Sequence, residues 1–197
     1  MRELLIASTN EGKLKEIAHL FKGLPLKCVS IADIRAEGDV EEVGETFEGN
    51  ALLKALIWGK RRGMLTLADD SGLEVDALGG RPGVYSARYP GKDWPDRRKN
   101  LLKEMAHVPN NKRTARFRAV IVIYDPKDDK TRICTGVTEG TITHEDIGTN
   151  GFGYDPIFRF TDSGKTGGEM ELEEKNKISH RGRAVVKARD ILLAEFA

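Results

Sequence analysis

An apolar run that ends in two adjacent carboxylates constrains this chain more than any other feature. Residues 64–68, Met-Leu-Thr-Leu-Ala, predict a short buried strand, and Asp69 and Asp70 follow it directly. Side chains alternate along a strand, so the two carboxylates are expected on opposite sides where the strand leaves its sheet. Because an unpaired buried charge is costly, one of them is expected to face a cleft and to serve a metal ion or a proton transfer. A turn in which Asp69, Asp70 and Ser71 bond nearby backbone is the alternative.

The order of the predicted elements indicates an α/β fold. Strands are expected at 2–7, 26–31, 64–68, 115–124 and 132–143, and helices at 12–22, at 94–106 and after the capping residues Thr46 and Ser179. The segment 126–130 is expected to turn between the last two strands, which then pair as an antiparallel hairpin. Glycine-rich loops are expected at 79–91 and 148–153. The pattern predicts a single domain over residues 1–197, with a mixed central sheet flanked by helices.

Charge and hydropathy exclude several classes of partner. The chain has 32 basic and 31 acidic residues, a net charge of +1, and therefore no overall field that attracts nucleic acid. No segment approaches the roughly 20 apolar residues of a membrane span, and the apolar part of the N-terminus is too short for a signal peptide. Cys28 and Cys134 are interpreted as reduced thiols. We therefore expect a cytoplasmic protein with neither a membrane nor a nucleic-acid partner.

The segment that joins the first predicted strand to the first helix has the composition of a phosphate-binding loop. Backbone N–H groups at a helix start attract anions, and a lysine adds a full positive charge. The frame from Ala7 to Leu14 approaches the P-loop pattern but lacks its first glycine and its magnesium-binding hydroxyl, which excludes a P-loop NTPase. An ordinary polar turn is the alternative. The candidate phosphate-binding residues are Ser8, Thr9, Asn10, Glu11, Gly12 and Lys13.

Further carboxylates and lysines could complete a metal-dependent site. Asn50 and Lys54 are four residues apart and share one helix face, while Glu42 lies in an irregular acidic stretch. Magnesium prefers carboxylate and phosphate oxygens and keeps several waters. A site with Glu42, Asp70 and a triphosphate would leave a bound water facing phosphorus, with Lys13 and Lys54 offsetting the phosphate charge. Taken singly, Glu42, Asn50 and Lys54 are better explained as exposed surface groups, and it is their combination with the other charged residues that favours a site.

The second glycine-rich loop and the last helix start could bind a nucleobase. Phe152 or Tyr154 can stack on a base, and Asp155 can accept hydrogen bonds from base N–H groups. Lys175, His180 and Arg181 could donate to base carbonyl oxygens, with Arg181 always protonated. Core aromatic residues beside a basic helix start are the alternative, and His180 taken alone is better explained as a structural histidine.

Taken together, these motifs resemble the inosine/xanthosine triphosphate pyrophosphatases, which hydrolyse non-standard purine nucleoside triphosphates. The resemblance covers nearly the whole chain. It rests on residues 8–13, Glu42 ahead of Thr46-Phe47, Asn50 with Lys54, residues 67–73, residues 80–89, residues 151–158, Glu174-Lys175-Asn176 and residues 179–184. Gly49 departs from it, because many members have a glutamate at this position, a possible capping-box partner of Thr46.

The resemblance implies a two-lobed α/β fold with the active cleft between the lobes, a homodimer and a Mg²⁺ requirement, with Mn²⁺ as a possible substitute. It implies that Asp70 is the proton acceptor and a metal ligand, and that Glu42 also lies near the metal. Nucleotide contacts are implied for Ser8 to Lys13, Ser71, Phe152, Gly153, Tyr154, Asp155, Lys175, His180 and Arg181.

The expected reaction converts ITP, dITP or XTP and water to the monophosphate and pyrophosphate, which cleanses the nucleotide pool. Lys13 and Lys54 would stabilise the departing pyrophosphate. Arg181 would donate to the purine 6-oxygen, a position at which adenine presents a donor. Two alternatives stay open: a broad pyrophosphatase acting on standard or pyrimidine triphosphates, and a nucleotide sensor without turnover. A nucleic-acid-binding module fits the balanced charge poorly.

Overall fold

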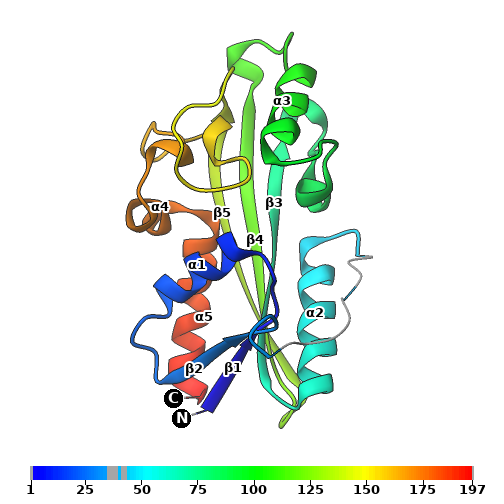
Figure 1. The fold of residues 1–197 in the computed structure, drawn as a ribbon, viewed down its shortest axis with the longest axis vertical. Helices are drawn as coiled ribbons and strands as arrows, with labels where there is room; N and C mark the ends of the chain where they lie inside the picture. Colours follow the sequence, from blue (N-terminus) through cyan, green and yellow to red (C-terminus); the bar gives the residue numbers. More distant parts are fainter. Residues whose placement is uncertain (1, 35–39, 41–43, 197) are drawn as a thin grey trace. The chain divides into compact units, whose positions relative to one another are not determined.

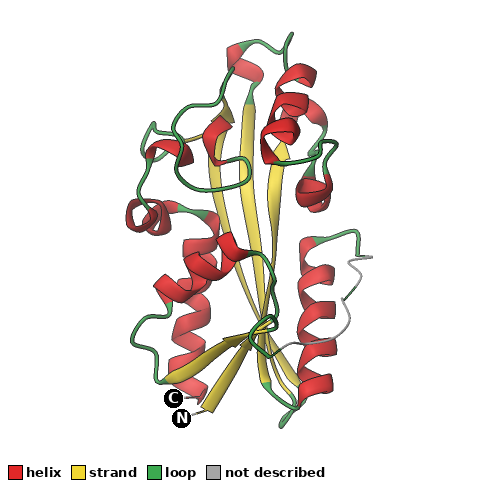
Figure 2. Cartoon of the chain, viewed as in Figure 1, coloured by secondary structure: helices red, strands yellow, loops and turns green. Residues whose placement is uncertain are grey.

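The computed structural model describes residues 2–34, 40 and 44–196, which form two compact units. Unit 1 consists of residues 1–70, 119–136 and 181–197, and unit 2 consists of residues 71–118 and 137–180. The chain passes between them within three long strands, β3 (Leu65–Val75), β4 (Thr114–Asp125) and β5 (Lys130–Ile142) (Figures 1 and 2).

The strands form a mixed six-stranded sheet in the order β2-β1-β3-β4-β5-β6. The first strand, β1 (Arg2–Ile6), pairs in parallel with both β2 (Leu26–Ser30) and β3, whereas β5 pairs antiparallel with β6 (Phe158–Phe160). Because β4 and β5 are neighbours joined by a short turn, the predicted hairpin is confirmed. The predicted α/β class with a mixed sheet is confirmed as well.

Unit 1 places helices on both faces of its strands. Figure 1 shows α1 (Glu11–Leu20) and α5 (His180–Phe196) on one side and α2 (Phe47–Arg62) on the other. The alternation of side chains along β3 follows this arrangement: Leu65 and Leu67 join an apolar cluster with residues of α1 and α5, whereas the Thr66 hydroxyl lies close to Gly59 of α2. Alternate residues of β3 in this unit therefore face different helices, α1 and α5 on one side and α2 on the other.

Helix α2 begins where the sequence predicts, without the glutamate at position 49. Thr46 is the N-cap, and its hydroxyl accepts a hydrogen bond from the Gly49 N–H at 3.0 Å. Its buried face includes Ala55 and Gly59, whereas Leu52 and Leu56 are only half-buried. Small residues allow the helix to approach the sheet closely: a Cβ at position 59 would meet the Tyr124 ring at 2.4 Å.

The predicted end of the third strand at residue 68 is wrong. β3 continues through both carboxylates to Val75, so the alternative of a turn at residues 69–72 is wrong too. The pairing with β1 does stop at Leu67, which lies opposite Ile6 and accepts a hydrogen bond from the Ala7 N–H. Asp69 and Asp70 thus lie inside a strand, just beyond the point where its parallel neighbour ends.

Unit 2 surrounds its strand segments with short helices and loops. The sequence predicts α3 (Trp94–Glu104) but misses both α4 (Leu172–Ile178) and β6, which are too short for a periodic signal. The predicted loop 79–91 contains a short 3₁₀ segment, Gly83–Arg88. The apolar core of unit 2 includes Leu73, Val75, Leu101, Met105, Phe117, Ile157, Phe158 and Phe160.

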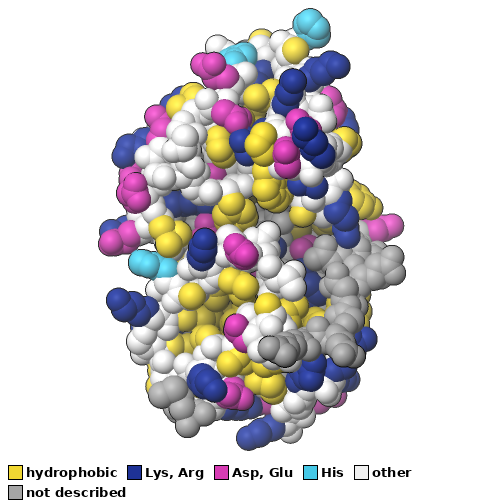
Figure 3. All heavy atoms as spheres, viewed as in Figure 1, with side chains coloured by type: hydrophobic (Ala, Val, Ile, Leu, Met, Phe, Trp, Pro, Cys, Tyr) yellow, Lys and Arg dark blue, Asp and Glu magenta, His cyan; other side chains and the backbone are white. Residues whose placement is uncertain are grey.

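Charges of both signs are interspersed over the face shown in Figure 3, in keeping with the net charge of +1. Among residues 2–34, 40 and 44–196, no helix combines the length and the apolarity that crossing a membrane requires.

Candidate functional site

The two adjacent carboxylates of β3 contact different helices of unit 1. Asp69 pairs with Lys13 of α1 and Arg181 of α5, whereas Asp70 contacts Asn50 and Lys54 of α2. α1 and α5 cover the face opposite to α2, so the predicted alternation is confirmed. Both carboxylates are buried, and each is compensated by its own set of donors.

Asp70 is held by two residues one helical turn apart on α2. Lys54 Nζ lies 3.2 Å from Oδ1, and Asn50 Nδ2 donates to Oδ2 at 3.2 Å. Each of these donors is itself fixed: Lys54 Nζ also donates to the Asp69 carbonyl oxygen at 2.8 Å, and Asn50 Oδ1 accepts from the Gly44 N–H at 2.8 Å. The carboxylate is therefore oriented before any ligand binds.

Asp69 is the centre of a buried ionic network that the sequence does not predict. Lys13 Nζ lies 2.5 Å from Oδ1, Arg181 Nε lies 3.1 Å from Oδ2, and Arg181 Nη1 lies 2.5 Å from Glu16 Oε2. Burial raises the pKa of the Asp69 carboxyl, but Arg181 and Lys13 outweigh it and hold that pKa well below its usual range. Burial lowers the pKa of Lys13, an effect that Asp69 opposes. Glu16 is not among the site residues that the sequence predicts.

The predicted phosphate-binding loop forms the start of α1. Asn10 is its N-cap, and the Asn10 side chain accepts from the Lys13 N–H at 3.1 Å. Ser8 Oγ accepts from the Asn10 N–H at 3.2 Å, which tightens the loop. The first N–H groups of an α-helix have no partner within the helix, so this end favours an anion. The loop thus brings Lys13 to Asp69, in the same unit as Asp70.

The described carboxylates fit a magnesium ion only in part. No group of three or more His, Cys, Asp or Glu side chains suited to a metal occurs in the described ranges 2–34, 40 and 44–196. Magnesium typically takes one or two carboxylates together with substrate phosphates and waters. Asp70 alone supplies the smallest number of carboxylates that such a site needs. Glu42, the second expected ligand, lies outside the described residues.

Unit 2 gathers a separate set of predicted nucleotide-binding residues. Lys175 Nζ lies 2.5 Å from Asp155 Oδ2, which also accepts from the Phe152 N–H at 2.8 Å. The same ammonium lies 4.9 Å from the centroid of the Phe152 ring. Gly151 has a φ of +72°, and a Cβ there would meet Asp155 Oδ2 at 2.2 Å, so the loop requires glycine at this position.

The structure separates the two aromatic candidates for base stacking. Tyr154 is buried, its hydroxyl donates to the Ser86 carbonyl oxygen at 3.0 Å, and its ring meets Trp94 edge to face at a centroid distance of 5.5 Å. Phe152 is only half-buried. Tyr154 is thus committed to the core of unit 2, which favours Phe152 as the stacking residue and gives Trp94 a packing role.

The remaining predicted residues divide between the two units. Ser71 follows Asp70 in β3 and is half-buried. His180 is buried in unit 2, whereas the adjacent Arg181 belongs to unit 1, where it pairs with Asp69 and Glu16. Asn176, next to Lys175, is buried with neither side-chain amide atom hydrogen-bonded. An asparagine within a helix gives no indication in the sequence that its side chain will be buried.

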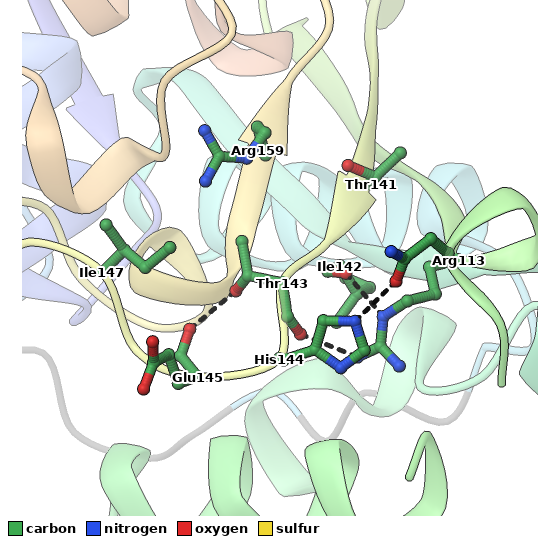
Figure 4. A pocket seen from close by; sticks show the side chains of 9 residues that line it. Arg113, Thr141, Ile142, Thr143, His144, Glu145, Ile147 and Arg159 are labelled. Carbon is green, nitrogen blue, oxygen red and sulfur yellow. Dashed lines mark hydrogen bonds between the residues drawn. The ribbon is translucent and has the colours of Figure 1, made fainter. Parts of the chain in front are cut away.

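A hollow of about 300 Å³ elsewhere in unit 2 is not lined by any of the predicted site residues that the structure describes (Figure 4). The buried guanidinium at its wall, that of Arg113, donates to the carbonyl oxygens of Ile142 at 2.8 Å and Thr143 at 2.7 Å. These bonds fix the backbone at the end of β5. The lining residues are Asn110, Arg113, Thr141, Ile142, Thr143, His144, Glu145, Ile147 and Arg159.

Known proteins resemble this chain in sequence over almost its full length. The model of the Ham1 family matches residues 4–191. The chain belongs to the Ham1 family. It is 47% identical over 194 residues to the dITP/XTP pyrophosphatase of Geobacter sulfurreducens, covering 98% of this chain and 97% of that one. The dITP/XTP pyrophosphatase of Escherichia coli K12 is 45% identical over 195 residues, covering 98% of each chain.

Solved structures of Ham1 proteins share the fold. A HAM1 protein from Coxiella burnetii superposes with a TM-score of 0.89 at 40% identity, covering 98% of this chain and 100% of that one. The Ham1 protein of Staphylococcus aureus gives a TM-score of 0.87 at 39% identity, with the same coverage. The mixed sheet described above is thus the Ham1 fold.

Proposed function

We propose that this protein hydrolyses the non-standard purine nucleoside triphosphates ITP, dITP and XTP to the monophosphate and pyrophosphate. The observation that carries the proposal is the Asp70 carboxylate, oriented by Asn50 and Lys54 in the unit that also holds Lys13 at the start of α1. The names of the relatives from Geobacter sulfurreducens and Escherichia coli support the same substrates.

Asp70 is the proposed general base. Its carboxylate takes a proton from the water that attacks the phosphorus bonded to the ribose oxygen. Lys13, Lys54 and the backbone N–H groups of residues 8–13 bind the triphosphate and offset the charge that develops on pyrophosphate. Asp70, together with Glu42, would hold Mg²⁺. That ion supplies charge neutralisation and a more acidic bound water, and Mn²⁺ is the expected substitute.

The base is assigned mainly to residues of unit 2. Phe152 stacks on the purine, Gly153 leaves room for it, and Asp155 and Lys175 contact its polar edge. Arg181, whose guanidinium also pairs with Asp69 and Glu16, donates to the 6-oxygen, and His180 donates to the same edge of the base. A site built to donate at this position rejects adenine, which presents a 6-amino donor there, while rejection of GTP depends on its 2-amino group. We further propose a cytoplasmic homodimer.

A substrate panel tests the proposal. Purified protein is assayed with ITP, dITP, XTP, GTP, ATP and a pyrimidine triphosphate, with and without Mg²⁺, by detection of pyrophosphate. We expect kcat/KM for ITP, dITP and XTP to exceed that for ATP and GTP by at least about a hundredfold. Equal rates with GTP or the pyrimidine would indicate a broad pyrophosphatase, and ITP binding without pyrophosphate release would indicate a sensor.

A further inference from the structure

The imidazole of His180 lies flat against the ring of Phe117 in unit 2. The two ring centroids are 4.6 Å apart and the ring planes are inclined by only 13°. His180 is 4% exposed and Phe117 is 7% exposed, so the contact is shielded from solvent. This is an offset stack rather than an edge contact, and it covers one face of the imidazole.

Phe117 is itself fixed by a row of aromatic side chains. It projects from β4, and its ring meets Phe158 at a centroid distance of 4.6 Å and an angle of 55°. Phe158 in turn meets Phe160 of β6 edge to face at 5.0 Å and 89°. All three rings belong to the apolar core of unit 2. The surface on which His180 rests is therefore part of the packed apolar core of unit 2.

Histidine makes its hydrogen bonds through the edge of its imidazole ring. Both ring nitrogens of histidine lie in the ring plane, so the tilt of that plane decides where their hydrogen bonds point. A flat partner fixes the tilt, whereas an aliphatic partner of similar size does not. A side chain fixed in advance loses less conformational entropy when a ligand binds.

We propose that Phe117 is a positioning residue that holds the His180 imidazole in the orientation required to bind the purine base. The proposal rests on the base-binding role of His180 under the proposed function. The contrasting interpretation is that His180 is an ordinary core histidine and that Phe117 contributes only apolar packing.

A pair of matched variants separates the two interpretations. Phe117→Leu removes the flat partner of His180, whereas Phe160→Leu makes the same chemical change at a buried ring of the same aromatic row. We expect similar losses of Tm in both. Only Phe117→Leu should raise KM and Kd for ITP, by roughly three- to tenfold, with kcat little changed. The ring-current shift of the His180 proton resonances should also disappear in Phe117→Leu alone.

A double-mutant cycle completes the test. In a His180→Gln background, Phe117→Leu should raise the Kd for ITP no further, because both changes remove one interaction. Equal Kd values in Phe117→Leu and Phe160→Leu, or His180 resonances that Phe117→Leu leaves in place, would overturn the proposal. The two failures are distinguishable, because the Kd is measured by calorimetry and does not depend on turnover. If the unmodified protein released no pyrophosphate, that result would contradict the proposed function and not the role of Phe117.

Discussion

Replacing Asp70 by asparagine is expected to lower kcat for ITP by about 10²- to 10⁴-fold, the usual contribution of a general base. Asparagine has nearly the same shape but cannot take a proton from water. Lys13 and the loop at residues 8–13 do not depend on Asp70, so the Kd for ITP should change little. Single-turnover kinetics give the chemical step, and calorimetry gives the Kd.

The matched control is Asp125→Asn. It makes the same change at a buried carboxylate of unit 1 that pairs with Arg2 at 2.7 Å. We expect kcat to stay close to that of the unmodified protein in this variant. Comparable turnover in Asp70→Asn and Asp125→Asn, at similar Tm, would refute the assignment of Asp70.

Replacing Asp69 by asparagine is expected to cost about 3–5 kcal/mol of unfolding free energy, because it leaves Lys13 and Arg181 as buried cations without their shared carboxylate. Denaturant titration at neutral pH measures the loss. Glu3→Gln is the control, since the Glu3–Lys27 pair of the same unit is exposed and should contribute little. A Tm of Asp69→Asn equal to that of Glu3→Gln would contradict the proposed importance of the network.

Acid pH should reduce the difference between the unmodified protein and Asp69→Asn. Burial raises the pKa of Asp69 in the folded protein, but the charges of Arg181 and Lys13 outweigh this effect and lower the pKa below its value in the unfolded chain. The unfolded chain therefore binds more protons in acid than the folded protein does. The stabilisation is therefore complete above the unfolded-state pKa of about 4 and is lost as the pH falls below it. A stability difference that stays constant from pH 6 to about pH 2 would contradict this account.

Local patterns predicted the parts of the site that depend on short-range geometry. The alternation of side chains places Asp69 and Asp70 on opposite sides wherever the strand lies, and helical periodicity brings Asn50 and Lys54 to one face. The capping of α2 by Thr46 also follows from a local hydrogen bond. Each of these features is decided within a few residues.

Features decided by distant contacts were not predictable from one sequence. The network at Asp69 joins residues 112 positions apart, and nothing near Glu16 indicates that it pairs with Arg181. β3 continues beyond residue 68 because it keeps β4 as a neighbour after β1 ends. The choice of Phe152 over Tyr154 depends on the hydroxyl bond to Ser86, which lies in another segment of unit 2.

Hydrolysis of ITP in ¹⁸O-enriched water, followed by mass spectrometry of both products, tests the central claim most directly. If the Asp70-activated water attacks the phosphorus bonded to ribose, one ¹⁸O atom will appear in the monophosphate and none in pyrophosphate. Label in pyrophosphate, or release of orthophosphate with a nucleoside diphosphate, would contradict the account.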